Sequence, residues 1–528
     1  MLEIEEIYPK LFYRNKLFPN IYSKEKNKIL IFSLSYIWIK YLSLLSTVFI
    51  KQSAQIKFVW SPYFYHDNQD QKFNQNQIDK LKNYFKYKIN NFDAIELNEI
   101  IEEEKATNED LKFIKNQSIT DIRLIRRKVR VNIENEDKDL FNLRYEINLK
   151  TFKKMKFFLK KNYFDRVIIP AGASFEWAIV AKICKDLKIQ YRTLESFFGR
   201  YDDQICTSLN ETCINWDTNQ ISKEWENKYP HILDKKTENH FKIIRNNFNS
   251  KDDEHSMQLK TEDKNEDYLR NKYKINKNEI VCLVLPSFSY EKHYRLKRYC
   301  FKDHTDWILK TINYLIDKKV KIIFKCHPIP YDPDGDKLNF KSGDENSEYI
   351  IKKYFPNKPK NLIVIYNEDK ISIESIMKIS DFGVSYFSTS AQELAWQGKK
   401  SIVCANIHFA EKKFVETAKN ESEYFNFIDT CLISKSNCKL SKELQNKSKV
   451  YADVWYRIKP WRIPWNILRG RYRYDIFPHS KILKLDFHFS LYARNFEKLF
   501  KNEKDCTNDY EKLINFLEYL KLNIKNKK

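Results

Sequence analysis

The stretch that decides the fold begins with Val320-Lys-Ile-Ile-Phe-Lys-Cys-His327-Pro328 and ends with Ser385-Tyr-Phe-Ser-Thr-Ser390, Gly398 and the apolar run Ser401–Ala405. Its apolar segments have the length of strands, and a polar loop follows each of the first two. The order predicts a strand, a His-Pro loop, a second strand, a Ser-Thr-Ser loop, a helix and a third strand. In a parallel α/β sheet both loops lie at the carboxyl ends of strands, where ligands bind.

The first loop begins with a histidine and a proline. Pro328 cannot donate a hydrogen bond to a strand ladder, so we expect it to end the strand and leave His327 at the rim. There the imidazole can donate a hydrogen bond to a phosphate oxygen. A His-Pro pair at a strand end is also compatible with an ordinary turn, and its combination with the second loop favours a binding site.

The second loop is rich in hydroxyl groups. Ser388, Thr389 and Ser390 open a short predicted helix that should end at Gly398. Hydroxyls and free amides at a helix N-terminus form an anion site, although the same residues also serve as an ordinary N-cap. Glu393 lies one turn into the helix, where it can accept hydrogen bonds from sugar or ribose hydroxyls. Together the two loops predict a nucleotide-sugar site.

The motifs "FKCHP" and "SDFGVSYFSTSAQELAWQGKKSIV" resemble the nucleotide-binding half of GT-B glycosyltransferases of bacterial surface polysaccharide synthesis. The most similar patterns are those of capsule-synthesis, Kdo-transferase and polysialyltransferase-like enzymes, and CDP-glycerol phosphotransferases carry a similar pair. The resemblance is clear over 275–405 and weaker over 160–220. It implies that His327 and the loop hydroxyls contact the donor phosphate. Ser385 stands where many enzymes with nucleotide-diphosphate donors have an acid, which favours a CMP- or CDP-linked donor.

Composition limits the class of protein. A chain of 528 residues is too long for one ordinary core, so two or three domains are expected. The net charge of +23 implies an anionic partner. We find no zinc-ligand spacing, RNA-binding signature or helix-turn-helix pattern, so nucleic acid is not expected, and an anionic membrane or acidic glycan is favoured. The ten cysteines include no Cys-x-x-Cys pair and indicate reduced thiols in a cytoplasmic protein.

We predict an α/β protein with two Rossmann-like domains that face a cleft, the GT-B arrangement. Residues 1–232 form the acceptor domain with a helical insertion at 66–136, and a polar linker follows at 233–272. Residues 273–440 form the nucleotide-sugar-binding domain, and 441–528 form a helical, basic tail. No Asp-x-Asp pair follows a strand where a metal would need it, so we expect neither a metal nor a cofactor.

Residues 29–50 are nearly long enough to span a bilayer, but Lys40 stands in their middle. We favour a strand over Lys28–Leu34, a helix over Tyr36–Lys51 and a strand over Ile56–Trp60, as at the start of a Rossmann-like half. Further helices are predicted over Ile78–Ile89, Ile95–Leu111, Asp139–Lys161 and Phe175–Leu187.

The first domain is expected to hold the acceptor and to supply the general base. Predicted strands over Arg166–Pro170 and Gln190–Leu194 bring acidic residues to one sheet edge. Glu195 is the first candidate, with Glu176 and Asp203 as further ones. The helix dipole also explains Glu176, and plain loop charge also explains Asp203.

Two basic regions have two explanations each. Ser289 and Lys292 follow the predicted strand Glu279–Pro286, where they can meet the donor phosphate or form an ordinary basic loop. The segment Arg457–Arg473 contains six basic residues and no acid, with tryptophans between them. It suits an anionic membrane surface and equally a segment that packs back onto the first domain.

We therefore predict a metal-independent glycosyltransferase, cytoplasmic or peripheral on the inner face of the membrane. It would move a sugar from a nucleotide-sugar to a glycan or lipid-linked glycan in surface polysaccharide synthesis. Three alternatives stay open: a CDP-glycerol-type glycerophosphotransferase, a non-hydrolysing sugar-nucleotide epimerase, and a non-catalytic glycan-binding or membrane-associated scaffold.

Overall fold

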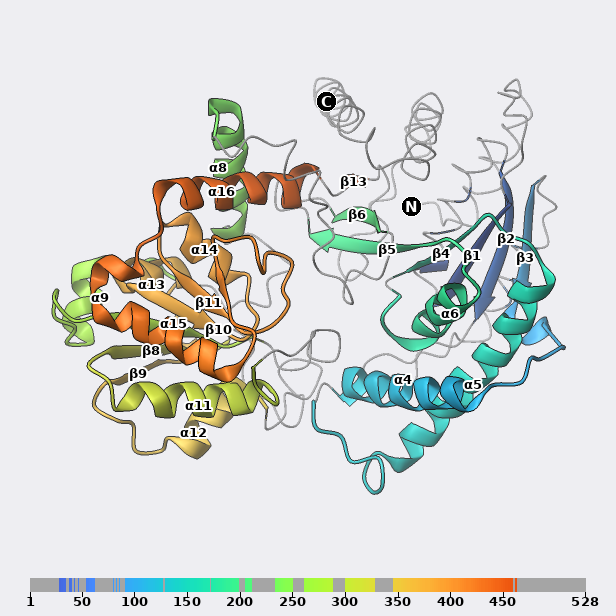
Figure 1. The fold of residues 1–528 in the computed structure, drawn as a ribbon, viewed down its shortest axis with the longest axis horizontal. Coiled ribbons are helices and arrows are strands. Elements are labelled where there is room, and N and C mark those ends of the chain that lie inside the picture. Colours follow the sequence, from blue (N-terminus) through green and yellow to red (C-terminus); the bar gives the residue numbers. More distant parts are fainter. Residues whose placement is uncertain are drawn as a thin grey trace.

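The computed structural model describes residues 28–34, 38–39, 42, 46, 54–61, 79, 82, 85, 91–126, 129–170, 172–198, 205–210, 233–249, 261–287, 300–327, 345–458 and 461–462. These residues form two mainly parallel sheets with helices around them, one sheet in each half of the molecule (Figure 1). The predicted α/β class is confirmed, and the two sheets are consistent with a two-domain GT-B-like fold.

The first sheet has the strand order β13-β6-β5-β4-β1-β2-β3. Strands β1 to β5 run parallel, whereas β6 is antiparallel to β5 and β13 is antiparallel to β6. The order reverses between β1 and β4, as in a doubly wound sheet. The strands are β1 (Lys28–Leu34), β2 (Gln55–Ser61), β3 (Phe92–Glu96), β4 (Arg166–Pro170), β5 (Tyr191–Phe198), β6 (Ile205–Asn210) and β13 (Trp461–Arg462).

Both faces of the first sheet are covered. Six of the seven residues of β1 are buried, as expected for a central strand between two layers. Leu30 and Phe32 pack under the helices on one face, and Ile31 packs with Phe58 on the other. The covering helices on the first face are α4 (Asn108–Arg126), α5 (Lys138–Lys161) and α6 (Phe175–Asp186).

Most predicted elements of this half are present, one is wrong, and the helices predicted over Tyr36–Lys51 and Ile78–Ile89 lie largely outside the described residues. The expected helix Ile95–Leu111 is replaced at its start by β3, which pairs with β2 from Phe92 to Glu96. The edge of β2 needs a partner for its backbone groups, and this tertiary pairing overrides the local helical period. Within the described residues, no helix combines the length and apolar character needed to cross a membrane.

The second sheet has the order β12-β11-β10-β7-β8-β9, and all its strands are parallel. Counted within this half, the strands follow the order three-two-one-four-five-six of a Rossmann fold. The order reverses between β7 and β10, so the ligand crevice of such a sheet lies beyond their carboxyl ends. The strands are β7 (Val281–Leu285), β8 (Lys321–Lys325), β9 (Leu362–Ile365), β10 (Phe382–Ser385), β11 (Ser401–Val403) and β12 (Glu416–Thr417).

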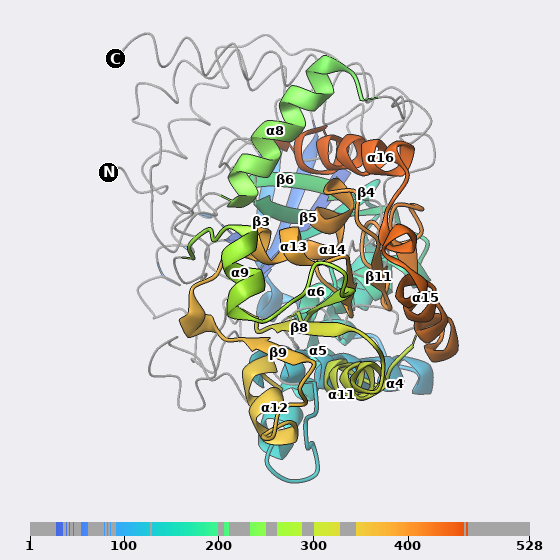
Figure 2. The ribbon, with the colours of Figure 1, turned by 90° about the vertical axis from the view of Figure 1, so that its left-hand side faces the viewer.

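Helices cover both faces of this sheet (Figure 2). Leu269, Met377 and Leu394 form a small core on one face. Ile308 and Ile428 belong to the larger core on the other. The first group of helices is α9 (Glu266–Lys272), α13 (Ile373–Ile379) and α14 (Ser390–Trp396), and the second is α11 (His304–Ile316), α12 (Ser347–Tyr354) and α15 (Glu421–Ile433).

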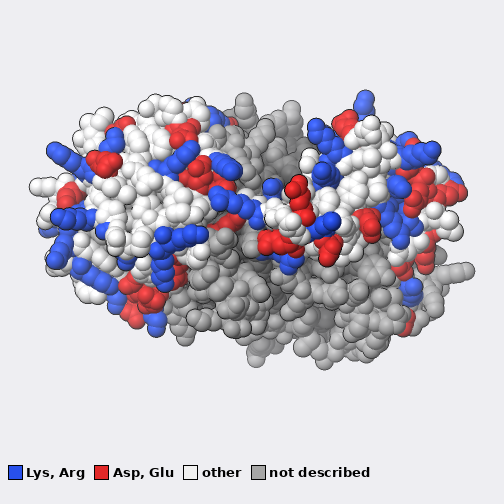
Figure 3. Space-filling model, turned by 90° about the horizontal axis from the view of Figure 1, so that it is seen from below, with Lys and Arg blue, Asp and Glu red and all other residues white. Residues whose placement is uncertain are grey.

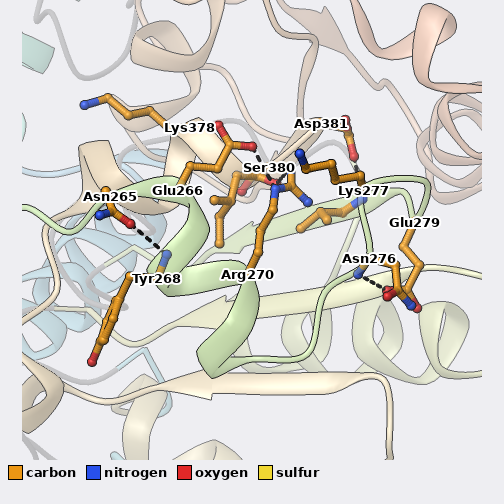
Figure 4. A network of polar contacts seen from close by, with 12 residues as sticks. Asn265, Glu266, Tyr268, Arg270, Asn276, Lys277, Glu279, Lys378, Ser380 and Asp381 are labelled. Carbon is orange, nitrogen blue, oxygen red and sulfur yellow. Dashed lines mark hydrogen bonds and ion pairs between the residues drawn. The ribbon is translucent and has the colours of Figure 1, made fainter.

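The amino-terminal edge of the second sheet is closed by polar contacts (Figure 4). The Asp381 carboxylate accepts a hydrogen bond of 2.8 Å from the Val281 N–H, where β7 begins. Nearby, Arg270 pairs with Glu266 on α9 at 2.7 Å. Side chains of the protein itself therefore occupy this edge, whereas ligands of such sheets bind at the opposite, carboxyl edge.

The chain returns to the first half near its end. Helices α8 (Lys235–Asn249) and α16 (Lys442–Asp453) pack together beside the second sheet, and β13 then pairs with β6 (Figure 1). The polar stretch 233–272 thus contains α8 and α9, while the predicted domain boundaries stay predictions. Trp455 is 4% exposed, so it packs in the core and does not face a membrane. The rest of the basic segment Arg457–Arg473 lies outside the described residues, apart from the backbone of a few positions.

Candidate functional site

His327 lies directly beyond the end of β8, at the carboxyl edge of the second sheet. Its backbone N–H donates to the Ser347 hydroxyl at 3.0 Å, which fixes the histidine against the start of α12. Burial and the nearby Lys325 ammonium lower the pKa of His327 to about 4. At neutral pH the ring is therefore uncharged in the unliganded protein, where it can donate one hydrogen bond.

A second histidine, which the sequence did not point to, lies beside the first. His304 is the first residue of α11 and is 1% exposed. Its Nε2 accepts a hydrogen bond of 3.1 Å from the Ser287 N–H, just beyond β7. Burial, followed by the effect of His327, lowers the pKa of His304 to about 3. The sequence around Asp303, the N-cap of α11, signals only a helix start.

The hydroxyl loop follows β10. Ser388, Thr389 and Ser390 are each partly exposed, and the Ser390 N–H donates to the Ser388 hydroxyl at 3.2 Å. Ser388 therefore caps this turn, and the Thr389 side chain makes no capping hydrogen bond. Because α14 has only seven residues, we assign any anion binding to the hydroxyls and not to a helix dipole. Gly398, with φ +76°, ends the helix as expected.

The two loops share one sheet edge. Strands β8 and β10 are the two neighbours of β7, so their ends lie about 10 Å apart, given a spacing of about 4.8 Å between strands. His304 stands between the loops. Its ring centroid is 6.0 Å from that of Tyr386, and electrostatic interaction with His327 lowers its pKa. Glu393 is partly exposed in the first turn of α14. The strand order thus brings the His327 and Ser388–Ser390 loops to the same edge of the second sheet, with the buried His304 between them.

Several predicted site residues cannot be placed. Pro328, Ser289, Lys292 and Asp203 lie outside the described residues, so their roles stay predictions. Among the described residues, no group of three or more His, Cys, Asp or Glu side chains is arranged to hold a metal ion.

Glu176 is buried against an arginine. It is 1% exposed and accepts a hydrogen bond of 3.0 Å from Arg144. Arg144 also contacts Asp121 at 3.2 Å, and Asp121 in turn accepts from the Phe175 N–H at 2.7 Å. Glu176 is therefore part of a buried ion-pair network, which favours a structural role, and its assignment as a general base stays a prediction. The same network places a carboxylate of the protein itself on the N-terminus of α6.

Glu195 lies inside β5 and not in a loop after it. The strand extends to Phe198, beyond the predicted end at Leu194, because β6 pairs with it as an antiparallel partner. The register pairs Pro170, the last residue of β4, with Leu194. Glu195 is thus one residue past the end of β4, at the carboxyl edge of the first sheet.

The histidine pair predicts a pH dependence of stability. The pKa values of His304 and His327, about 3 and 4, are below the ordinary value of 6.5. As the pH falls, the histidines of the unfolded chain therefore bind protons before those of the folded protein. The free energy of unfolding is fully maintained above about pH 6.5 and decreases as the pH falls through 4. For His304 this loss between pH 6.5 and 4 is on the order of 3 kcal/mol. Urea unfolding at both pH values measures it.

The control for this prediction is His304→Gln, because a glutamine carbonyl can still accept from the Ser287 N–H. The variant should lose less stability than the wild type over the same pH range. An equal loss in both proteins would show that His304 does not titrate in this way.

The chain matches no protein-family model and no curated protein sequence. Solved structures similar to it include the beta-Kdo 2,4-transferase KpsC of Thermosulfurimonas dismutans, with 13% identity, a TM-score of 0.33, and coverage of 54% of this chain and 79% of that one. They also include the UDP-GlcNAc 2-epimerase of Neisseria meningitidis bound to UDP-GlcNAc, with 11% identity, a TM-score of 0.24, and coverage of 81% and 98%. The UDP-GlcNAc 2-epimerase of Methanocaldococcus jannaschii gives 12% identity, a TM-score of 0.25, and coverage of 80% and 98%.

Proposed function

We propose that this protein is a glycosyltransferase that binds a nucleotide-sugar at the carboxyl edge of its second sheet and transfers the sugar to a glycan or lipid-linked glycan. The observation that carries the proposal is the common position of the His327 and Ser388–Ser390 loops. They follow β8 and β10, on either side of β7, at the point where a Rossmann-type strand order reverses.

The chemistry of this edge suits a leaving phosphate. A neutral imidazole and several hydroxyls can donate hydrogen bonds to phosphate oxygens as negative charge develops on the departing nucleotide. In the unliganded protein His327 is uncharged at neutral pH, and its ring can donate one hydrogen bond to a phosphate oxygen. Ser385 is fully buried in β10, so it is not available to replace the missing acid at this position.

The first domain would hold the acceptor. The N-terminus of α6, the place where a Rossmann-like half would bind a phosphate, already accommodates the Asp121 carboxylate at 2.7 Å. This favours the second domain as the nucleotide side. We propose Glu195 as the general base that removes the proton of the acceptor hydroxyl, because its backbone lies at the carboxyl edge of the first sheet.

A membrane-bound acceptor would need an attachment surface. On the face of the molecule shown in Figure 3, basic and acidic side chains of the described residues are interspersed. We propose the segment Arg457–Arg473 as the contact with an anionic membrane, because its sequence contains six basic residues and no acid.

The test is a thermal-shift panel of CMP, CDP, UDP and GDP, followed by turnover of the sugar-linked form of whichever nucleotide stabilises the protein. We expect one nucleotide to raise the melting temperature, and we expect nucleotide release to require an acceptor glycan. Product mass then distinguishes a transferred sugar from a transferred phosphoglycerol.

Two results would overturn the proposal. Conversion of the donor sugar to its epimer without an acceptor would assign an epimerase. The absence of stabilisation by all four nucleotides would favour a protein that binds glycan without catalysis.

A further inference from the structure

Two residues of the first domain are hydrogen-bonded to the second. The backbone N–H groups of Val129 and Arg130, in the connection between α4 and α5, both donate to the Glu345 carboxylate, at 2.8 and 2.9 Å. The Arg130 guanidinium donates to Asp303 from Nε at 3.0 Å and from Nη2 at 2.8 Å. Asp303 and Glu345 are buried, whereas the Arg130 side chain is 58% exposed.

Both acceptors are close in sequence to the residues that hold the histidine pair. Asp303 immediately precedes His304, and as the N-cap of α11 it also accepts from the Asp306 N–H at 2.9 Å. Glu345 stands two residues before Ser347, whose hydroxyl accepts from the His327 N–H. One loop of the first domain therefore contacts a residue next to His304 and a residue close to Ser347, the hydrogen-bond partner of His327.

We propose that Val129 and Arg130 form an interdomain latch with Asp303 and Glu345, and that this latch fixes His304 and His327 when the two domains come together. In this arrangement the first domain gives each of the two buried carboxylates two hydrogen bonds. The exposed position of Arg130 makes the ion pair weak enough to open and close. The latch goes beyond the proposed function, because it orders the edge of the second sheet whatever ligand binds there.

The experiment is hydrogen–deuterium exchange of the full chain, without nucleotide, on the wild type and on Arg130→Ala. The amides of Ser287 and His327 are informative, because each donates to a side chain that the latch is expected to fix. We expect peptides that contain them to exchange up to about fivefold faster in the variant, the effect of losing an ion pair of this exposure. Small-angle X-ray scattering should show a larger radius of gyration.

Two further variants make the result specific. Glu345→Ala removes the other half of the latch and should have the same effect. Arg245→Ala is the matched control outside the latch: Arg245 contacts Glu374 at 2.7 Å, and its side chain is 43% exposed. This variant should leave the exchange rates of both peptides unchanged. Faster exchange confined to the two peptides supports the latch. Unchanged exchange in both latch variants, or an equal increase throughout α5, would overturn it.

Discussion

Replacement of His327 by alanine is expected to remove the thermal stabilisation given by the preferred nucleotide. A hydrogen bond to a charged group contributes about 1.5–3 kcal/mol, so its loss should weaken nucleotide binding about tenfold to a hundredfold. The imidazole lies at the rim of the second sheet, while its backbone is fixed to Ser347 at 3.0 Å. The substitution should therefore change binding more than folding. Isothermal titration calorimetry of both proteins measures the difference.

His240→Ala is the control for this prediction. His240 is another partly buried histidine, and its Nδ1 lies 3.4 Å from Asp453 between α8 and α16, helices to which we assign no phosphate contact. It should lower stability slightly without changing nucleotide affinity. If His327→Ala binds the nucleotide as tightly as His240→Ala does, His327 does not contact the phosphate.

Replacement of Arg144 by alanine is expected to give the largest loss of stability. Arg144 is 1% exposed and contacts both Glu176 and Asp121, which are themselves buried. Without the guanidinium, two carboxylates remain in the core of the first domain with no cation beside them. Breaking a buried ion pair on one side costs about 3–5 kcal/mol. Urea unfolding at pH 7, followed by far-UV circular dichroism, measures the shift in midpoint.

Lys182→Ala is the matched control in the same domain. Lys182 pairs with Asp186 at 2.6 Å along α6, and the pair is partly open to solvent. Its loss should cost less than about 1 kcal/mol. Similar midpoints for the Arg144 and Lys182 variants would show that the buried network does not support the fold.

The central strands could be predicted because burial on both faces leaves a continuous apolar run. Thus β1 and β4 begin and end where the sequence indicated. The edge strand β3 could not be predicted, because it depends on the unpaired edge of β2 and not on an apolar run of its own. The same reason applies to β5, which continues to Phe198 only because β6 lies beside it.

The candidate site was predictable in part, since His327 and the Ser388–Ser390 loop follow recognisable strands. The place of His304 in the site could not be predicted, because its sequence context signals only the start of a helix. Its position depends on contacts with Ser287 and Tyr386, which follow two other strands. The role of Glu176 was hidden for a similar reason. Arg144 precedes it by 32 residues, and only the packing of α5 on α6 brings the two charges together.

The most direct test of the account is a crystal structure of the protein with the stabilising nucleotide bound. We predict that its terminal phosphate lies within hydrogen-bond distance of the His327 imidazole and of at least one hydroxyl among Ser388, Thr389 and Ser390. A phosphate bound at the N-terminus of α6 beside the first sheet, or anywhere away from the ends of β8 and β10, would contradict it.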